Sequence, residues 1–277
     1  MTGLKTFLIV KYRKLRTFYN KKLSRRFLFE VQLADHCNLN CASCSHFSPI
    51  ADEKFIDVSK YEKDCEKFAE LAKNNVHKIH LLGGEPLLHP NISDIIKITR
   101  KYFTKCKIKI ATNGILLDQM NEDFWKTCNA NNIIISINYY PIKINTKKIT
   151  ELSSQYHVKV ESFRRTWDFT FRKDIVDING THNSNDSFKK CLPVCHQLYE
   201  GKLYMCRVPA YIKYVNKYFS KDFSVSEGDY LDIYKIKNVN EIIKYIRNPI
   251  PFCRYCNMND GSVFEWCISK KESSEWL

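Results

Sequence analysis

Short apolar runs alternate with amphipathic segments through the first 165 residues. Runs typical of buried strands lie at 27–34, 78–82, 107–111, 133–138 and 157–163. Apolar residues at helical spacing occupy the intervals, at 60–73, 90–103, 119–130 and 146–156. Strands that alternate with helices of about ten to fifteen residues indicate βα units around a parallel sheet. We therefore expect an α/β fold, a partial (βα)6 TIM-like barrel that is open on one side and whose sixth strand is not evident from the pattern.

The rest of the chain lacks this alternation. Residues 163–190 are irregular and rich in turn formers such as Asn179-Gly180, which indicates a linker or a flap over the barrel mouth. A cysteine-rich segment follows, with a hairpin expected at His196–Met205 that turns at Glu200-Gly201. The expected parts are a basic N-terminal arm (1–26), the partial barrel (27–165), a linker or flap (166–190) and a small module of hairpin plus helix (191–277).

Composition limits the expected cellular compartment and the expected classes of binding partner. No run of about 18 apolar residues is present, and the N-terminus lacks the features of a signal peptide, so we expect a cytoplasmic protein without a membrane partner. The net charge is +14, but lysine is spread over the whole chain, so we do not expect a nucleic-acid partner. Twelve cysteines without an export signal argue against a disulfide scaffold and favour metal binding.

Three cysteines lie within eight residues, in the stretch Cys37-Asn-Leu-Asn-Cys41-Ala-Ser-Cys44. Three thiolates on one loop can bind three irons of a [4Fe–4S] cubane, because cysteine is the usual ligand of such clusters. The next cysteine, Cys65, belongs to the apolar stripe of a predicted helix and is a core residue. The fourth iron is therefore left open, and a small molecule can chelate it.

This spacing, Cys-x3-Cys-x2-Cys, resembles the signature of the radical S-adenosylmethionine (radical SAM) superfamily. The resemblance implies that S-adenosylmethionine binds the open iron. It also implies that one electron, from a donor such as flavodoxin or ferredoxin, cleaves the sulfonium to give a 5′-deoxyadenosyl radical that abstracts a substrate hydrogen. The residue before the third cysteine is often aromatic in this family and is Ser43 here. His46 or Phe47 is then the candidate to cover the adenine.

Further motifs follow the predicted strands, where ligands gather in parallel sheets. By resemblance, Gly83-Gly84-Glu85-Pro86 is the family's glycine-rich motif, whose backbone receives the methionine amino group, and Thr112-Asn113-Gly114 is a turn near the cofactor. Ser136 and Asn138 match polar contacts to the ribose, although a Ser or Asn that closes a strand is often only a turn former. Arg164, with Arg165, either pairs the cofactor carboxylate or an anionic substrate, or is solvated.

The C-terminal third carries a second cysteine set: Cys191, Cys195, Cys206, Cys253, Cys256 and Cys267. It resembles the auxiliary-cluster modules of the SPASM and twitch subfamilies, and the shorter twitch form implies one additional [4Fe–4S] cluster. We expect Cys206, Cys253 and Cys256 as ligands. The hairpin favours Cys195 as the fourth ligand, family spacing favours Cys191, and Cys267 is a spare. A zinc ribbon is the alternative, since Cys-x2-Cys pairs commonly bind zinc.

The sequence indicates the class of substrate less clearly than it indicates the cofactor. Peptide-modifying relatives usually carry a leader-binding domain before the barrel, whereas the barrel here begins near residue 27, which favours a small molecule. By resemblance, we expect a sugar or nucleotide sugar of a polysaccharide or natural-product pathway, with oxidation, dehydration or epimerisation as the reaction. The alternatives are a radical SAM maturase of ribosomal peptides and a non-catalytic Fe–S or zinc binding module.

Overall fold

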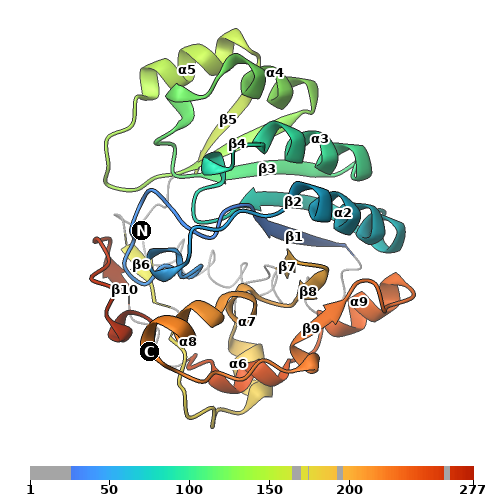
Figure 1. Cartoon of the computed structure of the whole chain (residues 1–277), viewed down its shortest axis with the longest axis vertical. Coiled ribbons are helices and arrows are strands. Elements are labelled where there is room, and N and C mark those ends of the chain that lie inside the picture. The colour runs from blue at the N-terminus through green and yellow to red at the C-terminus, as the bar shows by residue number, and fades with distance from the viewer. Residues whose placement is uncertain (1–25, 164–169, 174, 192–195, 259–262) are drawn as a thin grey trace, which may run out of the picture.

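An open, mostly parallel sheet organises the computed structural model, which describes residues 26–163, 170–173, 175–191, 196–258 and 263–277 (Figure 1). Its first five strands are parallel neighbours in the order β5-β4-β3-β2-β1. They are β1 (Phe27–Gln32), β2 (Val76–Leu82), β3 (Lys107–Thr112), β4 (Ile133–Asn138) and β5 (Lys159–Phe163). All five strands were predicted from the apolar runs, and the α/β partial barrel is confirmed.

The sheet continues beyond β1 into the C-terminal segment. There β7 (His196–Tyr199) pairs in parallel with β1, while β8 (Lys202–Tyr204) and β9 (Tyr230–Asp232) add antiparallel strands. The sixth parallel strand therefore lies beside the first strand, not beyond the fifth. The hairpin is confirmed, and its turn residues Glu200 and Gly201 have φ of 49° and 75°, the left-handed geometry that matches the twist of a hairpin.

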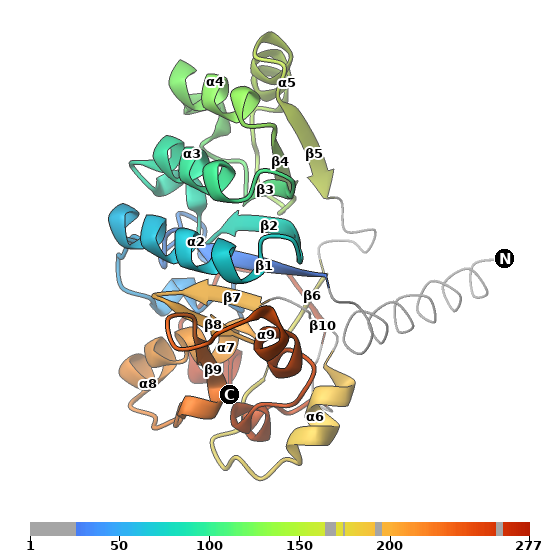
Figure 2. The ribbon, with the colours of Figure 1, turned by 90° about the vertical axis from the view of Figure 1, so that its right-hand side faces the viewer.

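Four helices cover one face of the strands (Figure 2): α2 (Val58–Ala72), α3 (Ile92–Tyr102), α4 (Glu122–Ala130) and α5 (Thr146–Gln155). Alternate strand residues point to this face. Phe29 of β1 is fully buried there, with its ring 5.1 Å from that of Phe68 and 5.4 Å from that of Phe103. In the described part of the chain, no helix is long and apolar enough to span a bilayer.

A second core lies in the C-terminal part, around α7 (Arg207–Tyr211) and α8 (Lys213–Phe219). The helix α9 (Val239–Tyr245) contributes its buried Ile242 to the first core. It also contains Phe47 and Ile50, which follow the first cysteine cluster, and Trp276 near the chain end. The cysteine loop therefore leaves the first core at β1 and enters the second core just after Cys44. Its position depends on both cores.

The segment expected to be irregular contains two short elements, β6 (Thr170–Arg172) and α6 (Ser184–Lys190). β6 pairs with β10 (Val263–Glu265), which is more than 90 positions further along the chain. Three-residue strands are too short to show a period, and α6 has only the helix cap Asn183 as a local signal. Neither element was predictable from hydrophobic spacing.

Phe68 provides a test of the first core. Phe68→Ala removes a fully buried ring that contacts β1, and we expect the free energy of unfolding to fall by about 3–5 kcal/mol. Chemical denaturation followed by far-UV circular dichroism measures this loss. The matched control is Tyr218→Ala, since that ring is 49% exposed and should cost less than about 1 kcal/mol. Equal losses in the two variants would contradict the assignment of this core.

Candidate functional site

The cysteine loop begins at the carboxyl end of β1 and is bonded to the glycine-rich turn that follows β2. The amide of Gly84 donates to the carbonyl of Ala34 (2.7 Å), and the amide of Glu85 donates to that of His36 (3.1 Å). A Cβ on residue 84 would lie 2.0 Å from the His36 carbonyl oxygen, so only glycine fits. The structure thus brings together the two motifs that the sequence predicted to meet.

Glu85 joins this turn to the next one. Its carboxylate is fully buried and accepts hydrogen bonds from the Thr112 hydroxyl (2.7 Å), the Leu87 amide (3.1 Å) and the Asn113 amide (3.0 Å). Burial raises the pKa of Glu85 to about 7, against the opposite effect of these donors. The Asn113 side chain then donates to Asn38 Oδ1 (2.8 Å), which ties the third strand to the cysteine loop. The Glu85 side chain therefore acts as an internal bracket, by which we mean that its hydrogen bonds connect the glycine-rich turn to the Thr112-Asn113 turn.

The thiols of Cys37, Cys41 and Cys44 are half-buried, and those of Cys37 and Cys41 face N–H donors. Cys37 Sγ accepts from the Leu39 amide (3.3 Å) and from Asn113 Nδ2 (3.8 Å), and Cys41 Sγ accepts from the Trp266 indole (3.1 Å). Burial raises the pKa of Cys37, and that of Cys41 to about 12. Donors aimed at sulfur suit an iron–sulfur cluster, whose sulfurs accept such bonds. The residues present fit the group.

Within the described ranges, no three His, Cys, Asp or Glu side chains converge closely enough to coordinate one metal ion. A cubane makes a different demand, because each thiolate binds a separate iron atom and the ligands are spread over a larger shell. The absence of a single-ion site among the described residues therefore leaves the cysteine loop as a candidate binding site for a [4Fe–4S] cluster.

Four cysteines of the second set lie in one region of the fold, although in the described residues no three of them converge closely enough to coordinate a single metal ion. Burial, and then the neighbouring thiols of Cys256, Cys191 and Cys253, raise the pKa of Cys206. Cys191 ends α6, and α6 packs against the 3-10 turn of Cys253, with the Ser187 hydroxyl donating to the carbonyl of Cys256 (3.0 Å). Of the alternatives for the fourth position, Cys191 is in this group, and Cys195 lies outside the described residues.

Cys267 lies beside the first cluster instead. Its carbonyl accepts from the Ala42 amide (2.9 Å), and its thiol is close enough to Cys41 to raise the pKa of that thiol. Residues 263–277 fold back onto the cysteine loop. Cys267 is near Cys253 and Cys256 in sequence, but in the structure it lies beside Cys41. The location of Cys267 therefore does not support it as a spare ligand of the second cysteine set.

Polar side chains line the face of the sheet opposite the helices. Cross-strand register places Glu30, His80 and Lys109 on this face, and Ser136 of β4 opposite Glu161 of β5, to which Lys109 is paired. In a parallel sheet, partners in register share a face. Asn138 lies two residues after Ser136, on the same side. Both residues that were expected near the ribose therefore belong to this polar face.

The buried centre of the polar face is Glu30. Its carboxylate contacts His80 Nδ1 (3.2 Å) and accepts from Gln197 Nε2 of β7 (2.9 Å). Burial is the largest single cause and raises the pKa of Glu30, but the hydrogen bond to His80 and the charges of His80, Arg207 and His46 together outweigh it, so the net shift is downward. These three residues were not predicted as site residues from the sequence. The available signal was Glu30 itself, a charge inside the apolar run Phe-Leu-Phe-Glu-Val-Gln-Leu.

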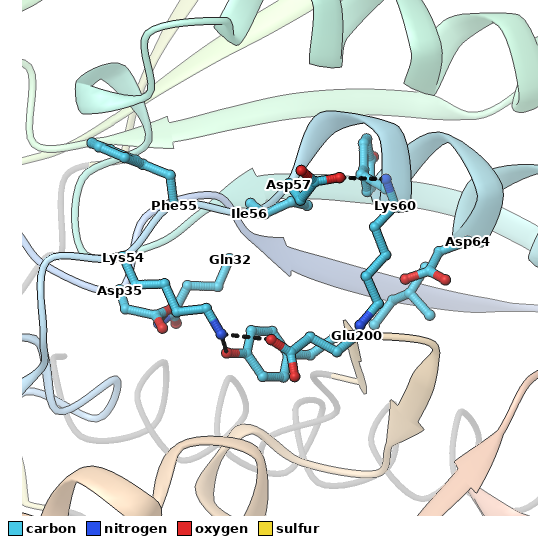
Figure 3. A pocket seen from close by; sticks show the side chains of 12 residues that line it. Gln32, Asp35, Lys54, Phe55, Ile56, Asp57, Lys60, Asp64 and Glu200 are labelled. Carbon is cyan, nitrogen blue, oxygen red and sulfur yellow. Dashed lines mark hydrogen bonds and ion pairs between the residues drawn. The ribbon is translucent and has the colours of Figure 1, made fainter.

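A cleft of about 100 Å³ lies elsewhere, between the start of α2 and the turn of the hairpin (Figure 3). Lys54 Nζ bonds Glu200 Oε1 (2.5 Å) and the Tyr199 hydroxyl (3.1 Å) across it. Asp35, at the start of the cysteine loop, lines it, but none of the cysteines and no residue of the glycine-rich turn or the Thr112-Asn113 turn does. Lys54 and Glu200 of this cleft are paired with each other, and we assign it no catalytic role.

Some expectations concern residues that the structure does not describe, or places differently. Arg164, Arg165 and the basic arm up to residue 25 lie outside the described residues. Phe47 is 3% exposed, with its ring 6.3 Å from that of Trp276 in the second core. This burial removes Phe47 as a cover for an adenine. His46 remains at the loop, with its ring 6.4 Å from that of Tyr211.

The family model named Radical SAM superfamily matches residues 31–178, just over half of the chain. The chain belongs to the radical SAM superfamily. The protein is therefore an enzyme of a family that binds a [4Fe–4S] cluster and S-adenosylmethionine. The matched region spans the cysteine loop, both strand-end turns and the strands β2–β5, and it begins one residue after Glu30.

Curated relatives of this radical SAM protein include GTP 3′,8-cyclases. The one from Synechocystis sp. is 31% identical over 127 residues, which is 44% of this chain and 36% of the relative. The one from Chlorobaculum tepidum is 35% identical over 89 residues, 32% of this chain and 26% of the relative. The chain thus matches about a third of the length of such relatives.

Solved structures show the same fold. BtrN in complex with AdoMet and 2-DOIA superposes with a TM-score of 0.52 at 18% identity, covering 84% of this chain and 93% of BtrN. Native anSMEcpe with bound AdoMet gives a TM-score of 0.51 at 14% identity, covering 83% of this chain and 82% of that chain.

Glu85 provides a test of the site's internal bracket. In Glu85→Gln, an amide N–H₂ replaces one of two oxygens that face only donors, and we expect the free energy of unfolding to fall by about 1–3 kcal/mol. Denaturation at a pH above 7 measures this loss with the carboxylate ionised. The control Glu53→Gln changes an exposed carboxylate and should have little effect. If Glu85→Gln were as stable as this control, the result would contradict the claim that the Glu85 carboxylate holds the two turns together.

Proposed function

We propose that this enzyme cleaves S-adenosylmethionine at a [4Fe–4S] cluster held by Cys37, Cys41 and Cys44, and uses it to remove a hydrogen atom from a polar small molecule. When bound, the cluster and S-adenosylmethionine supply one-electron cleavage of the sulfonium and a hydrogen-abstracting 5′-deoxyadenosyl radical. The electron comes from a donor such as flavodoxin or ferredoxin. The observation that carries the proposal is the pair of backbone bonds that joins the cysteine loop to Gly84 and Glu85.

The chain's own contribution at this end of the sheet is to bind and orient. Gly83 and Gly84 carry no side chain where the backbones of Ala34 and His36 approach, so the turn lies directly against the loop. In our proposal the backbone of Gly83-Gly84-Glu85-Pro86 receives the amino group of the methionine moiety. Thr112 and Asn113, held by the Glu85 carboxylate, border the same space.

We place the substrate and the ribose of the cofactor against the polar face of the sheet. Ser136 and Asn138 lie on it, and the ionised Glu30 holds His80 in one orientation through Nδ1. A wall of carboxylate, imidazole and amide groups suits a substrate with hydroxyl groups, because such groups exchange hydrogen bonds with it. This supports a sugar or nucleotide sugar. The name of the GTP 3′,8-cyclase relatives makes a guanosine nucleotide the second substrate to test.

We further propose that Cys191, Cys206, Cys253 and Cys256 hold an auxiliary [4Fe–4S] cluster. The grouping of these thiols around Cys206 supports a four-cysteine shell, which leaves no iron open. Such a cluster suits a step in which the substrate radical gives up an electron, as in the oxidation of an alcohol. Zinc is the other occupant that four thiolates accept, and metal analysis distinguishes the two.

The first test is the formation of 5′-deoxyadenosine. Anaerobically reconstituted protein, S-adenosylmethionine and dithionite should give 5′-deoxyadenosine, measured by liquid chromatography. Cys37→Ala should reduce the yield to background, because a cluster ligand is lost. The matched control Cys128→Ala changes a buried cysteine of α4 and should retain activity. Adding a panel of sugars, nucleotide sugars and GTP should raise the yield for the true substrate class. No 5′-deoxyadenosine from the wild-type protein would overturn the proposal.

The second test counts metal. We expect about eight irons per wild-type chain and about four in Cys191→Ala, because a three-cysteine shell no longer retains the auxiliary cluster as firmly. Iron and zinc are measured by inductively coupled plasma mass spectrometry. The control Cys267→Ala should keep the wild-type count, since Cys267 lies beside Cys41. About four irons together with one zinc in the wild-type protein would refute the auxiliary cluster but leave the radical enzyme intact.

A further inference from the structure

The end of the chain is fastened across the first cysteine loop. We define the C-terminal strap as residues 263–277. Its backbone bonds the loop twice, from the Ala42 amide to the Cys267 carbonyl and from the Ser269 amide to the Asn40 carbonyl, both at 2.9 Å. Figure 1 shows the strap's strand β10 with β6 beside the segment that contains the loop. Segments more than 200 positions apart in the sequence are therefore adjacent at this site.

Side chains of the strap add three contacts to the loop. Glu275 Oε2 accepts from the Ser43 amide (3.1 Å), and Trp276 Nε1 donates to the Cys44 carbonyl (2.9 Å). The third contact, from Trp266 Nε1 to Cys41 Sγ (3.1 Å), reaches a sulfur atom. Trp276 is 1% exposed in the second core, so the strap is anchored there. Backbone and side-chain hydrogen bonds therefore hold the cysteine loop and the C-terminal strap together.

Trp266 is held in place by other aromatic side chains. Its ring centroid lies 6.3 Å from that of Tyr140, which stacks on Phe171 of β6 at 5.7 Å with an interplanar angle of 8°. Phe171 in turn contacts Phe264 of β10 at 6.3 Å. These contacts limit the rotation of the Trp266 indole, so its N–H stays directed at Cys41 rather than at solvent.

We propose that Trp266 is a positioning residue that raises the reduction potential of the [4Fe–4S] cluster through its N–H···S bond to Cys41. This inference rests on the proposed role of Cys37, Cys41 and Cys44. Reduction adds negative charge to the cluster and its thiolates, and a donor aimed at a thiolate stabilises the more negative state. The strap thereby couples the fold of the C-terminal segment to the ease with which the cluster accepts its electron.

The test is a redox titration of the cluster, followed by electron paramagnetic resonance (EPR) in the absence of S-adenosylmethionine. Trp266→Phe keeps a ring among Tyr140 and its neighbours but removes the donor, and its midpoint potential should be lower than that of the wild type. The matched control is Trp125→Phe. The Trp125 indole N–H is buried in the first core and has no hydrogen-bond partner in the described part of the chain, so the potential should not change. Equal potentials for Trp266→Phe and the wild type would overturn the proposal.

A second measurement does not depend on the folding of any variant. In wild-type protein labelled with 15N-indole tryptophan, pulsed EPR of the reduced cluster should detect hyperfine coupling to an indole nitrogen, because Nε1 of Trp266 is in contact with a ligand sulfur. The absence of this coupling would contradict the inference. A wild-type protein that assembles no [4Fe–4S] cluster at the triad would instead refute the proposed function, so the two failures are distinguishable.

Discussion

The contact between the backbones of Gly84 and His36 is the constraint on which the site depends. A Cβ at residue 84 would lie 2.0 Å from the His36 oxygen, so the turn after β2 can reach the cysteine loop only as glycine. This approach fixes where the loop starts, and with it the relation between the three thiols and the ends of β2 and β3. Glu85, the next residue, extends the connection to Thr112 and Asn113.

The other end of the loop is fixed by a different part of the fold. Phe47 and Ile50 enter the second core, and the C-terminal strap binds the backbone between Asn40 and Cys44. The triad is thus supported from the barrel on one side and from the C-terminal part on the other. Since β7 also pairs with β1, the two parts share one sheet, and the region around Cys206 is connected to the barrel through that strand.

Local pattern was enough to predict the five strands and four helices of the barrel and the meeting of the cysteine loop with the glycine-rich turn, because adjacent βα units place strand ends at one edge. It was not enough for the pairing of β7 with β1, or for the positions of Trp266 and Cys267 beside the cysteine loop. Their positions depend on pairings between segments far apart in the chain, which hydrophobic period does not encode. Glu30 and His80 illustrate a third case: a charged residue in a buried strand is visible in the sequence, but its partner is not. Phe47 was misjudged because burial in the second core outweighed its nearness in sequence to the cysteines.

The central claim is that the triad leaves one iron open for S-adenosylmethionine. EPR spectra of the dithionite-reduced protein, recorded with and without S-adenosylmethionine, test it most directly, with Cys191→Ala used to remove the signal of the auxiliary cluster. We predict that S-adenosylmethionine shifts the g values of the remaining signal, because the cofactor becomes a ligand of the cluster. An unchanged spectrum at saturating S-adenosylmethionine would show a closed cluster and contradict the account.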